Sequence, residues 1–318
     1  MFLKSRMLFI YTETPLHAGT GTGLGAVDLP IQRERATGYP IVQASGIKGA
    51  LRSESPDGDE KDAVKDAVFG PKNAEHAGAL SPGDGRILLF PVRSLSGVFA
   101  WTTSYDALAR FRRDAVAMGL DQGQNPVPEL PADNPKGNDA LASGTRVLVN
   151  PQGDKGTAVL EEFAFQCTVD EKATAWAQWL AQEALPSQAS APEYTPWIER
   201  LEDSLLILPE DAFRDFLLHA TEVVTRVRLE PDSKTVASGA LWTQEHLPGD
   251  SLLYAPVHAT RLRIRRRKPS ELADDDPRQE ANKVLGWVEE KVPQRIQLGG
   301  DETVGRGIVR LRWNGGTQ

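Results

Sequence analysis

The amino-acid sequence predicts an α+β protein whose strands are dispersed along the whole chain. Three observations lead to this fold class. Runs rich in β-branched and aromatic residues occur near both ends and in between, segments with helical periodicity separate them, and no internal repeat is evident. With 318 residues, 40% of them hydrophobic, the chain can bury a substantial core as one elaborated domain or two small ones.

The first unit is predicted to be a strand, a loop and a helix. Residues 8–14 alternate in a β-rich pattern, residues 15–25 form a glycine-dense loop, and residues 41–52 lead into a short helix. Further elements are expected in the order helix, strand, helix, at residues 57–66, 86–91 and 105–118.

The middle of the chain begins with an irregular segment. Residues 121–144 are rich in Pro, Asn, Gly and Ala and show little periodicity, which predicts an exposed insertion rather than a domain linker. After it we expect a β-hairpin formed by residues 145–150 and 158–168, and then helices at residues 172–184 and 209–218.

A second predicted hairpin projects from the fold. Residues 221–230 and 235–244 are β-rich, and they flank the turn sequence Pro-Asp-Ser-Lys. The remaining elements are expected to be a strand, a helix and a closing strand, at residues 252–265, 278–292 and 308–313.

Composition limits the function classes. The net charge of −8 argues against a freestanding nucleic-acid-binding domain, although clustered Lys and Arg can create a local basic groove. A single cysteine excludes disulfides within the chain and cysteine zinc sites. No apolar run is long enough for a signal peptide or a membrane span, so we expect a cytoplasmic protein with no membrane partner.

The segment at residues 17–34, which begins in the glycine-dense loop, contains a loose dinucleotide-binding pattern that we reject. That fingerprint must open a helix, and Pro30 follows too soon for one to form. The segment also carries His17 and one acidic residue near its centre, Asp28. A flexible surface loop with an ordinary carboxylate is the alternative interpretation.

Two further segments carry patterns typical of phosphate binding. In the first, Ser45 is expected to cap a helix, and Lys48 and Arg52 share one helix face, so that amides and cations together form a phosphate cradle. In the second, a glycine loop carries Arg306 in front of the closing strand. An ordinary capped helix and a tight connecting loop are the alternatives.

A third basic segment, RLRIRRRK at residues 261–268, has six cations in eight residues. Leu262 and Ile264 are expected to point inward, which leaves either a phosphate-tracking edge or a solvated strand face. No HExxH, GxSxG or Cys/His metal spacing is present, so no hydrolase has a local signature here.

Taken together, these segments resemble the RAMP superfamily of CRISPR proteins, and most closely the backbone subunits of type III-B (Cmr) effectors. The resemblance rests on the order of PLHAG, a glycine loop, VDLPIQRERATGYP, SGIKGALR, FGP, LFPVRSLSGVFAW, ALWTQEHLP and LGGDETVGRG, and it spans nearly the whole chain. It implies a single domain over residues 1–318, with a ferredoxin-like (RRM-related) palm, inserted helical fingers and a β-hairpin thumb at about residues 221–247.

The resemblance also implies a function. Such subunits stack along a guide RNA (crRNA) in several copies, together with other subunits of the effector complex, and cut complementary target RNA at regular intervals. Asp28 occupies the place of the aspartate required for cutting, either as a general base or as a ligand of a divalent metal, expected to be Mg²⁺. His17, Glu245 and His246 are further catalytic candidates, although the window containing the last two departs from the family pattern.

The residues expected to hold the RNA backbone come from the helix start and the C-terminal loop. They are Ser45, Gly46, Lys48, Gly49, Arg52, Gly299, Gly300, Gly305, Arg306 and Gly307. The alternative function is a non-catalytic crRNA-binding scaffold of a related type III complex. A guide-processing RAMP ribonuclease ranks last, because no second ferredoxin-like unit and no convincing histidine pair is evident.

Overall fold

The computed structural model of the chain describes residues 2–23, 25–230, 232–233, 235–264 and 268–315. Arg265, Arg266 and Arg267 of the predicted basic run lie outside the described residues, as do Pro231 and Lys234 of the predicted hairpin turn. In the part that is described, no helix is long and apolar enough to cross a membrane.

Strands and helices are both dispersed along the whole chain, in agreement with the predicted α+β class. The strands are β1 (Lys4–Thr12), β2 (Ile41–Val42), β3 (Leu80–Pro82), β4 (Gly85–Ser94), β5 (Val98–Ser104), β6 (Asp139–Ala142), β7 (Leu148–Gln152), β8 (Lys155–Leu160), β9 (Phe163–Val169), β10 (Leu205–Leu208), β11 (Glu222–Leu229), β12 (Val236–His246), β13 (Leu252–Ala259), β14 (Arg295–Gln297) and β15 (Ile308–Asn314). The helices are α1 (Ala44–Ser53), α2 (Asp59–Phe69), α3 (Tyr105–Ala117), α4 (Glu171–Glu183), α5 (Thr195–Glu202), α6 (Glu210–His219) and α7 (Pro277–Lys291).

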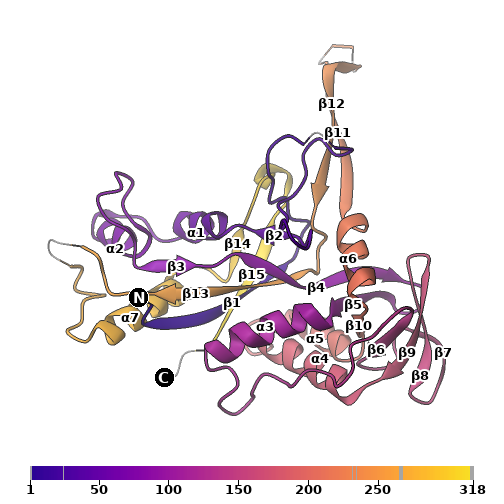
Figure 1. The fold of residues 1–318 in the computed structure, drawn as a ribbon. Helices are drawn as coiled ribbons and strands as arrows, with labels where there is room; N and C mark the ends of the chain where they lie inside the picture. Colours follow the sequence, from indigo (N-terminus) through magenta and orange to yellow (C-terminus); the bar gives the residue numbers. More distant parts are fainter. Residues whose placement is uncertain (1, 24, 231, 234, 265–267, 316–318) are drawn as a thin grey trace.

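One large mixed sheet organises the fold (Figure 1). Its main path runs β14-β15-β1-β13-β4-β5-β10-β6-β9-β8-β7, with β2 paired to β4 and β3 paired to β13. The first strand, β1, is antiparallel to both of its neighbours, β13 and β15. The N-terminal strand and the closing strand therefore lie side by side, which brings the loop after β1 close to the loop before β15.

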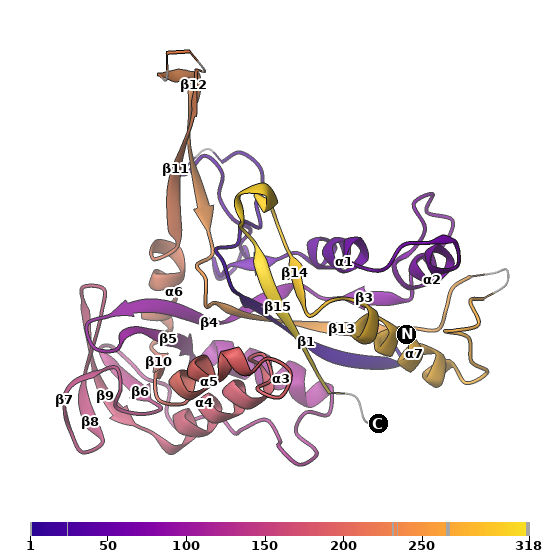
Figure 2. The same cartoon turned by 180° about the vertical axis from the view of Figure 1, so that it is seen from behind.

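Both faces of β1 are buried, because helices cover the sheet on two sides. Met7, Phe9 and Tyr11 belong to a core formed with α3, α4 and α5, whereas Leu8 and Ile10 belong to a second core that includes residues of α1, α2, α6 and α7. Alternation with a period of two assigns these neighbours to opposite faces. Figures 1 and 2 show α3, α4 and α5 on the opposite side of the sheet from α1 and α2.

The second hairpin is confirmed as a separate two-stranded sheet. β11 and β12 pair antiparallel from Glu222↔His246 through Val227↔Leu241, and they extend away from the rest of the molecule (Figure 1). The hairpin follows α6, and its second strand leads into β13. Its base is therefore fixed to the main sheet, whereas its far end is not.

Several predictions need correction. The segment predicted as an exposed insertion ends in β6, which lies inside the sheet between β10 and β9, with Ala140 and Ala142 buried. The run at residues 158–168 is two strands, β8 and β9, joined by a turn at Glu161, whose φ is 48°. An alternating pattern is present in both strands, and the turn between them contains no Gly or Pro. The sequence therefore predicts one continuous strand where the structure has two.

Two other differences concern local signals. The sequence interpretation missed α5 and β10, which have only eight and four residues. The predicted strand at residues 252–265 ends at Ala259, as β13, so the start of the basic run lies beyond the strand. Leu262 nevertheless points inward, as expected, with 3% of its surface exposed.

Candidate functional site

The loop that follows β1 packs along the free edge of the hairpin base. Leu29 donates its amide to Thr243 O at 3.0 Å and accepts from the amide of Glu245 at 3.0 Å. Leu16 and Leu247 exchange a second pair of backbone hydrogen bonds, at 2.8 and 2.9 Å. β12 therefore has β11 on one edge and the loop on the other, and this pairing places Asp28 at the hairpin.

Asp28 is exposed and held by one residue of β12. Its Oδ2 accepts hydrogen bonds from the amide of Thr243 at 2.7 Å and from Thr243 Oγ1 at 2.8 Å. In return, the amide of Asp28 donates to Thr243 Oγ1 at 3.0 Å. These contacts, the backbone amide first, lower the pKa of Asp28 below its ordinary value. The site thus presents an ionised carboxylate in a defined position, open to solvent.

Glu245 is a buried carboxylate with both oxygens engaged. Oε2 accepts from the amide of Ile31 at 3.0 Å, while Oε1 accepts from Arg33 at 2.5 Å and from Thr221 Oγ1 at 2.8 Å. Only 5% of the residue is exposed. These bonds attach the loop after β1 and the short segment between α6 and β11 to the hairpin base. Glu245 therefore has a structural role in positioning the site.

The two histidines lie side by side beneath the loop. Their ring centroids are 5.5 Å apart. His17 donates from Nδ1 to Glu245 O at 2.7 Å, and a Cβ at Gly19 would stand 2.5 Å from its Nε2. The ring can therefore occupy this place only because residue 19 is glycine. A neutral His17 with this hydrogen bond leaves Nε2 without a proton.

His246 is fully buried, and its surroundings disfavour charge. Its Nε2 lies 3.4 Å from Asp301 Oδ2, and Nδ1 has no hydrogen-bond partner among the described residues. Burial lowers the pKa of His246, with Asp301 opposing that effect only in part. This histidine packs as a neutral ring near neutral pH.

The C-terminal glycine loop meets the same place. Gly299 has φ 81°, and a Cβ there would stand 2.5 Å from His17 O, while the Gly300 amide donates to His17 O at 2.9 Å. Asp301 accepts from Arg226 of β11 at 2.9 Å. The segments around residues 17, 28, 245 and 300, distant in sequence, are thereby brought together at the hairpin base.

The predicted helix start behaves differently from the expectation. α1 begins at Ala44, and Ser45 is not its cap; instead the carboxylate of Asp84 accepts from the Ala44 amide at 2.8 Å. Arg52 is engaged with Asp66 at 2.7 Å and with the carbonyl of Gly70. Among the predicted cations of α1, Lys48 is the one left without an anionic partner in the described structure.

The other predicted contact residues differ in exposure. Ser45, Gly46 and Gly49 are exposed on α1, and Gly305 is exposed in the C-terminal loop. Arg306 is half-buried and lies 3.6 Å from Glu222 Oε2, while Gly307 is buried and donates its amide to Pro15 O. In Figure 1, α1 and the loop that carries Asp28 lie on the same side of the main sheet.

The sequence interpretation missed several residues that build the site. Thr243 holds Asp28 through a hydrogen bond. Arg33 neutralises Glu245, and Thr221 donates a hydrogen bond to it. Asp301 connects the C-terminal loop to the hairpin. The sequence contained a signal for Thr243 alone. In a strand, residues two apart lie on the same face, so Thr243 is expected to share a face of β12 with the candidate Glu245. The contacts of Arg33 and Asp301 cross between distant segments and have no local signal.

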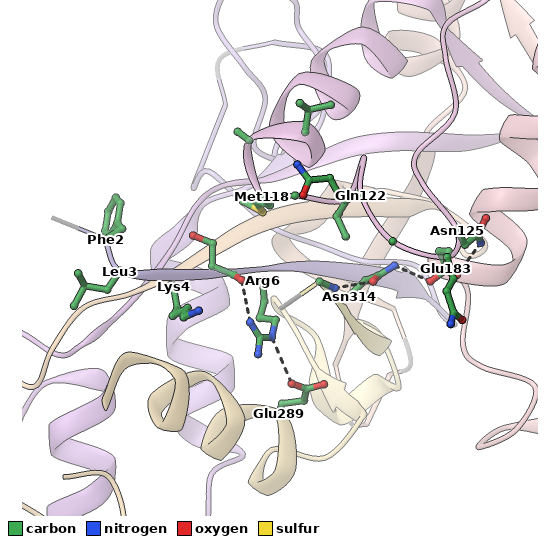
Figure 3. Close-up of a pocket in the computed structure, with 18 of the residues that line it drawn as sticks. Phe2, Leu3, Lys4, Arg6, Met118, Gln122, Asn125, Glu183, Glu289 and Asn314 are labelled. Carbon is green, nitrogen blue, oxygen red and sulfur yellow. Dashed lines mark hydrogen bonds and ion pairs between the residues drawn. The ribbon is translucent and has the colours of Figure 1, made fainter. Parts of the chain in front are cut away.

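No ready-made metal centre accompanies Asp28. Over the described ranges, no group of three His, Cys, Asp or Glu side chains is placed to hold a metal ion. A cavity of about 1100 Å³ lies elsewhere, between the start of β1 and the end of α3. In its wall, Arg6 lies 4.0 Å from Glu289, and Asn125 donates to Glu183 (Figure 3). None of the residues around Asp28 lines this cavity.

Comparison with known proteins identifies similar chains over the full length. The model of the RAMP superfamily matches residues 9–310. The chain is 37% identical over 324 residues to the CRISPR system Cmr endoribonuclease Cmr4 of Pyrococcus furiosus, with 99% of each chain covered. It is 24% identical to the CRISPR system CMR subunit Cmr4 of Saccharolobus solfataricus, with 96% of this chain and 95% of that one covered.

Solved structures agree. The crystal structure of oligomeric Cmr4 from Pyrococcus furiosus matches with a TM-score of 0.67 and 30% identity, covering 99% of this chain and 100% of that one. A chain of the type III-B Cmr-beta complex bound to cognate target RNA, seen by cryo-electron microscopy, matches with a TM-score of 0.67 and 22% identity, covering 98% of each. At that identity the second match supports the fold alone.

Proposed function

The chain belongs to the RAMP superfamily, and from this premise we propose that it is a repeating backbone subunit of a type III-B CRISPR effector. In this role it binds crRNA, assembles with further copies of itself and with other subunits, and cleaves complementary target RNA. A full-length relative with 37% identity is named an endoribonuclease, and a similar chain forms oligomers in a crystal.

The finer division of the fold follows from the same proposal. The part of the sheet around β1, β13 and β15 corresponds to the ferredoxin-like palm, helices inserted between its strands to the fingers, and the hairpin of β11 and β12 to the thumb. The thumb base then lies where the catalytic loop and the C-terminal loop meet. Target RNA passing the thumb would come within reach of Asp28.

The observation that carries the proposed activity is the exposed, ionised carboxylate of Asp28, held by Thr243 at the hairpin base. In RNA cleavage, the 2′-hydroxyl attacks the adjacent phosphorus and the bond from phosphorus to the 5′-oxygen breaks. The hydroxyl proton passes to the carboxylate, and the departing 5′-oxygen takes a proton from water. The products are a 2′,3′-cyclic phosphate and a 5′-hydroxyl end.

A divalent cation is compatible with this site when RNA is present. Mg²⁺ is commonly held by one or two carboxylates together with substrate phosphates and water, so Asp28 is a sufficient protein ligand. Such an ion would supply stabilisation of the negative charge that develops on the phosphate. We propose Asp28 either as the general base or as the residue that holds this ion, with Mg²⁺ as the expected metal.

The other catalytic candidates take supporting roles in this proposal. Glu245 has both oxygens occupied and His246 is buried, so we assign both to positioning. His17 is partly exposed and keeps two alternatives, an acid or phosphate contact and a structural ring beneath Gly19. Ser45, Gly46, Gly49 and the C-terminal loop contact the RNA backbone without reading bases.

The test is target cleavage by the assembled complex with Mg²⁺, comparing the wild-type chain with Asp28→Ala and Asp28→Asn. Asp121→Ala, at an exposed acid after α3, is the matched control. We expect both Asp28 variants to bind target RNA and to leave it uncut, while the control cuts normally. Unchanged cutting by Asp28→Ala would move the chemistry elsewhere and leave the chain as a non-catalytic crRNA-binding scaffold.

A further inference from the structure

Three cations lie on two segments that are distant in the sequence, α1 and the chain that follows β13. Lys48 lies on α1, and Arg261 and Arg263 follow β13. α1 packs against β3, and Leu80 of β3 pairs with Ala259 at the end of β13, so the segment that carries the two arginines begins beside α1. Burial, followed by the positive charges of Arg263 and Arg52, lowers the pKa of Lys48. The two segments lie at the same end of the main sheet (Figure 1).

These cations have no anionic partners in the described structure. The side chains of Lys48, Arg261 and Arg263 take part in no ion pair and no hydrogen bond with another described residue, although the chain has 44 acidic residues and 36 basic ones. Neighbouring cations are paired, Arg52 with Asp66 and Lys268 with Glu280. Like charges gathered without counter-charges raise the free energy of the unliganded protein, and an anionic ligand relieves that repulsion.

The backbone that carries the two arginines is fixed in place. Leu262 is buried between them, and its amide donates to Glu280 Oε2 at 2.8 Å. Glu280 is itself 1% exposed and accepts from Lys268 at 2.5 Å. Because the anchor lies between them, Arg261 and Arg263 are both held outward and exposed. The backbone beneath the two arginines is therefore ordered before an anion binds, and binding has to order only their side chains.

We infer that Lys48, Arg261 and Arg263 form a phosphate-binding surface for the backbone of the guide RNA, separate from the loops at the hairpin base. Guanidinium groups bind phosphate well, and contacts to phosphate carry no sequence preference. This inference rests on the proposed function and extends the RNA-binding face from Lys48 of α1 to the two arginines that follow β13. It makes the segment after β13 part of the RNA-binding face.

The test is the salt dependence of RNA binding by the purified chain, measured by fluorescence anisotropy with labelled single-stranded RNAs of two unrelated sequences. Each phosphate contact adds about 0.7 to the slope of log affinity against log salt for a single strand. The double variant Arg261→Gln/Arg263→Gln should therefore reduce the slope by about 1.4. Between 50 and 200 mM salt, the wild-type chain should lose about sevenfold more affinity than the variant.

A matched control removes the same charge elsewhere. Lys155→Gln/Lys172→Gln also lowers the net charge by two at exposed sites on β8 and α4, away from α1 (Figure 1). We expect it to keep the wild-type slope. Thermal unfolding of both double variants should match the wild type, because the changed side chains are exposed.

Each outcome decides between explanations. A slope for the arginine variant equal to that of the control would overturn the inference, because it would show that these arginines contact no phosphate. An unchanged slope combined with failed assembly would likewise overturn it and would indicate an acidic protein surface as the ligand. If the wild-type chain itself showed no salt-dependent RNA binding, the proposed function would fail, which is distinguishable from failure of this inference alone.

Discussion

Replacement of Glu245 by Gln tests whether this carboxylate only positions the site or also takes part in RNA cleavage. The substitution keeps the size of the side chain and removes its charge. Arg33 would then lose its ion-pair partner, and a side-chain NH₂ would face donors that now meet a carboxylate oxygen. Arg33 would keep its bonds to the carbonyls of Gly38 and Leu217 through NH1.

The expected loss of stability follows from the burial of the pair. Removing one partner of a buried ion pair costs about 3–5 kcal/mol. The Arg33 side chain is 20% exposed, so water can solvate it partly and the lower end applies, about 3 kcal/mol. With an unfolding entropy of roughly 2.1 cal/mol/K per residue, a chain of this length should show a fall in Tm of about 4–5 °C.

The assay is urea unfolding followed by tryptophan fluorescence, with a thermal melt in parallel. Glu129→Gln is the control, because Glu129 pairs with Arg112 with 68% of its side chain exposed, and such a pair contributes at most about 1 kcal/mol. A Glu245→Gln chain within about 1 kcal/mol of wild type would refute the reasoning. Wild-type stability together with lost cleavage would instead assign Glu245 a direct part in the reaction.

Three further changes test the same site. Thr243→Val removes a hydroxyl donor from Asp28, so the pKa of that carboxyl should rise; we expect a roughly tenfold loss of cleavage and an acid limb of the pH–rate profile displaced to higher pH. Gly299→Ala should destabilise the chain by about 1–3 kcal/mol in urea unfolding, because its positive φ and close approach exclude a Cβ, whereas Gly300→Ala should be near neutral. Burial lowers the pKa of His246, so the unfolded chain binds a proton at this residue more readily than the folded chain does. The free energy of unfolding of the wild type should therefore fall as the pH drops below about 6.5, by at most about 1.4 kcal/mol per pH unit. The His246→Gln chain should show a shallower fall in the free energy of unfolding between about pH 7.5 and 5.5.

Local patterns in the sequence were sufficient for the fold class and for several elements. Helical periodicity identified α3, α4 and α7, and two β-rich runs around a Pro-Asp turn identified the projecting hairpin. These features depend on residues close together in the chain, so a short window contains the whole signal. The order of the sequence motifs likewise indicated the RAMP superfamily, whose model matches residues 9–310.

Only the tertiary structure determined the contacts between segments that are distant in the sequence. Thr243 holds Asp28 and Arg33 neutralises Glu245, while Asp66 engages Arg52 and leaves Lys48 beside Arg263. The polar or charged character of each residue was visible in the sequence, but its partner was not. Whether a charge is buried and paired or exposed and available depends on which strands and loops become neighbours, and the packing of the complete sheet and its helices determines this.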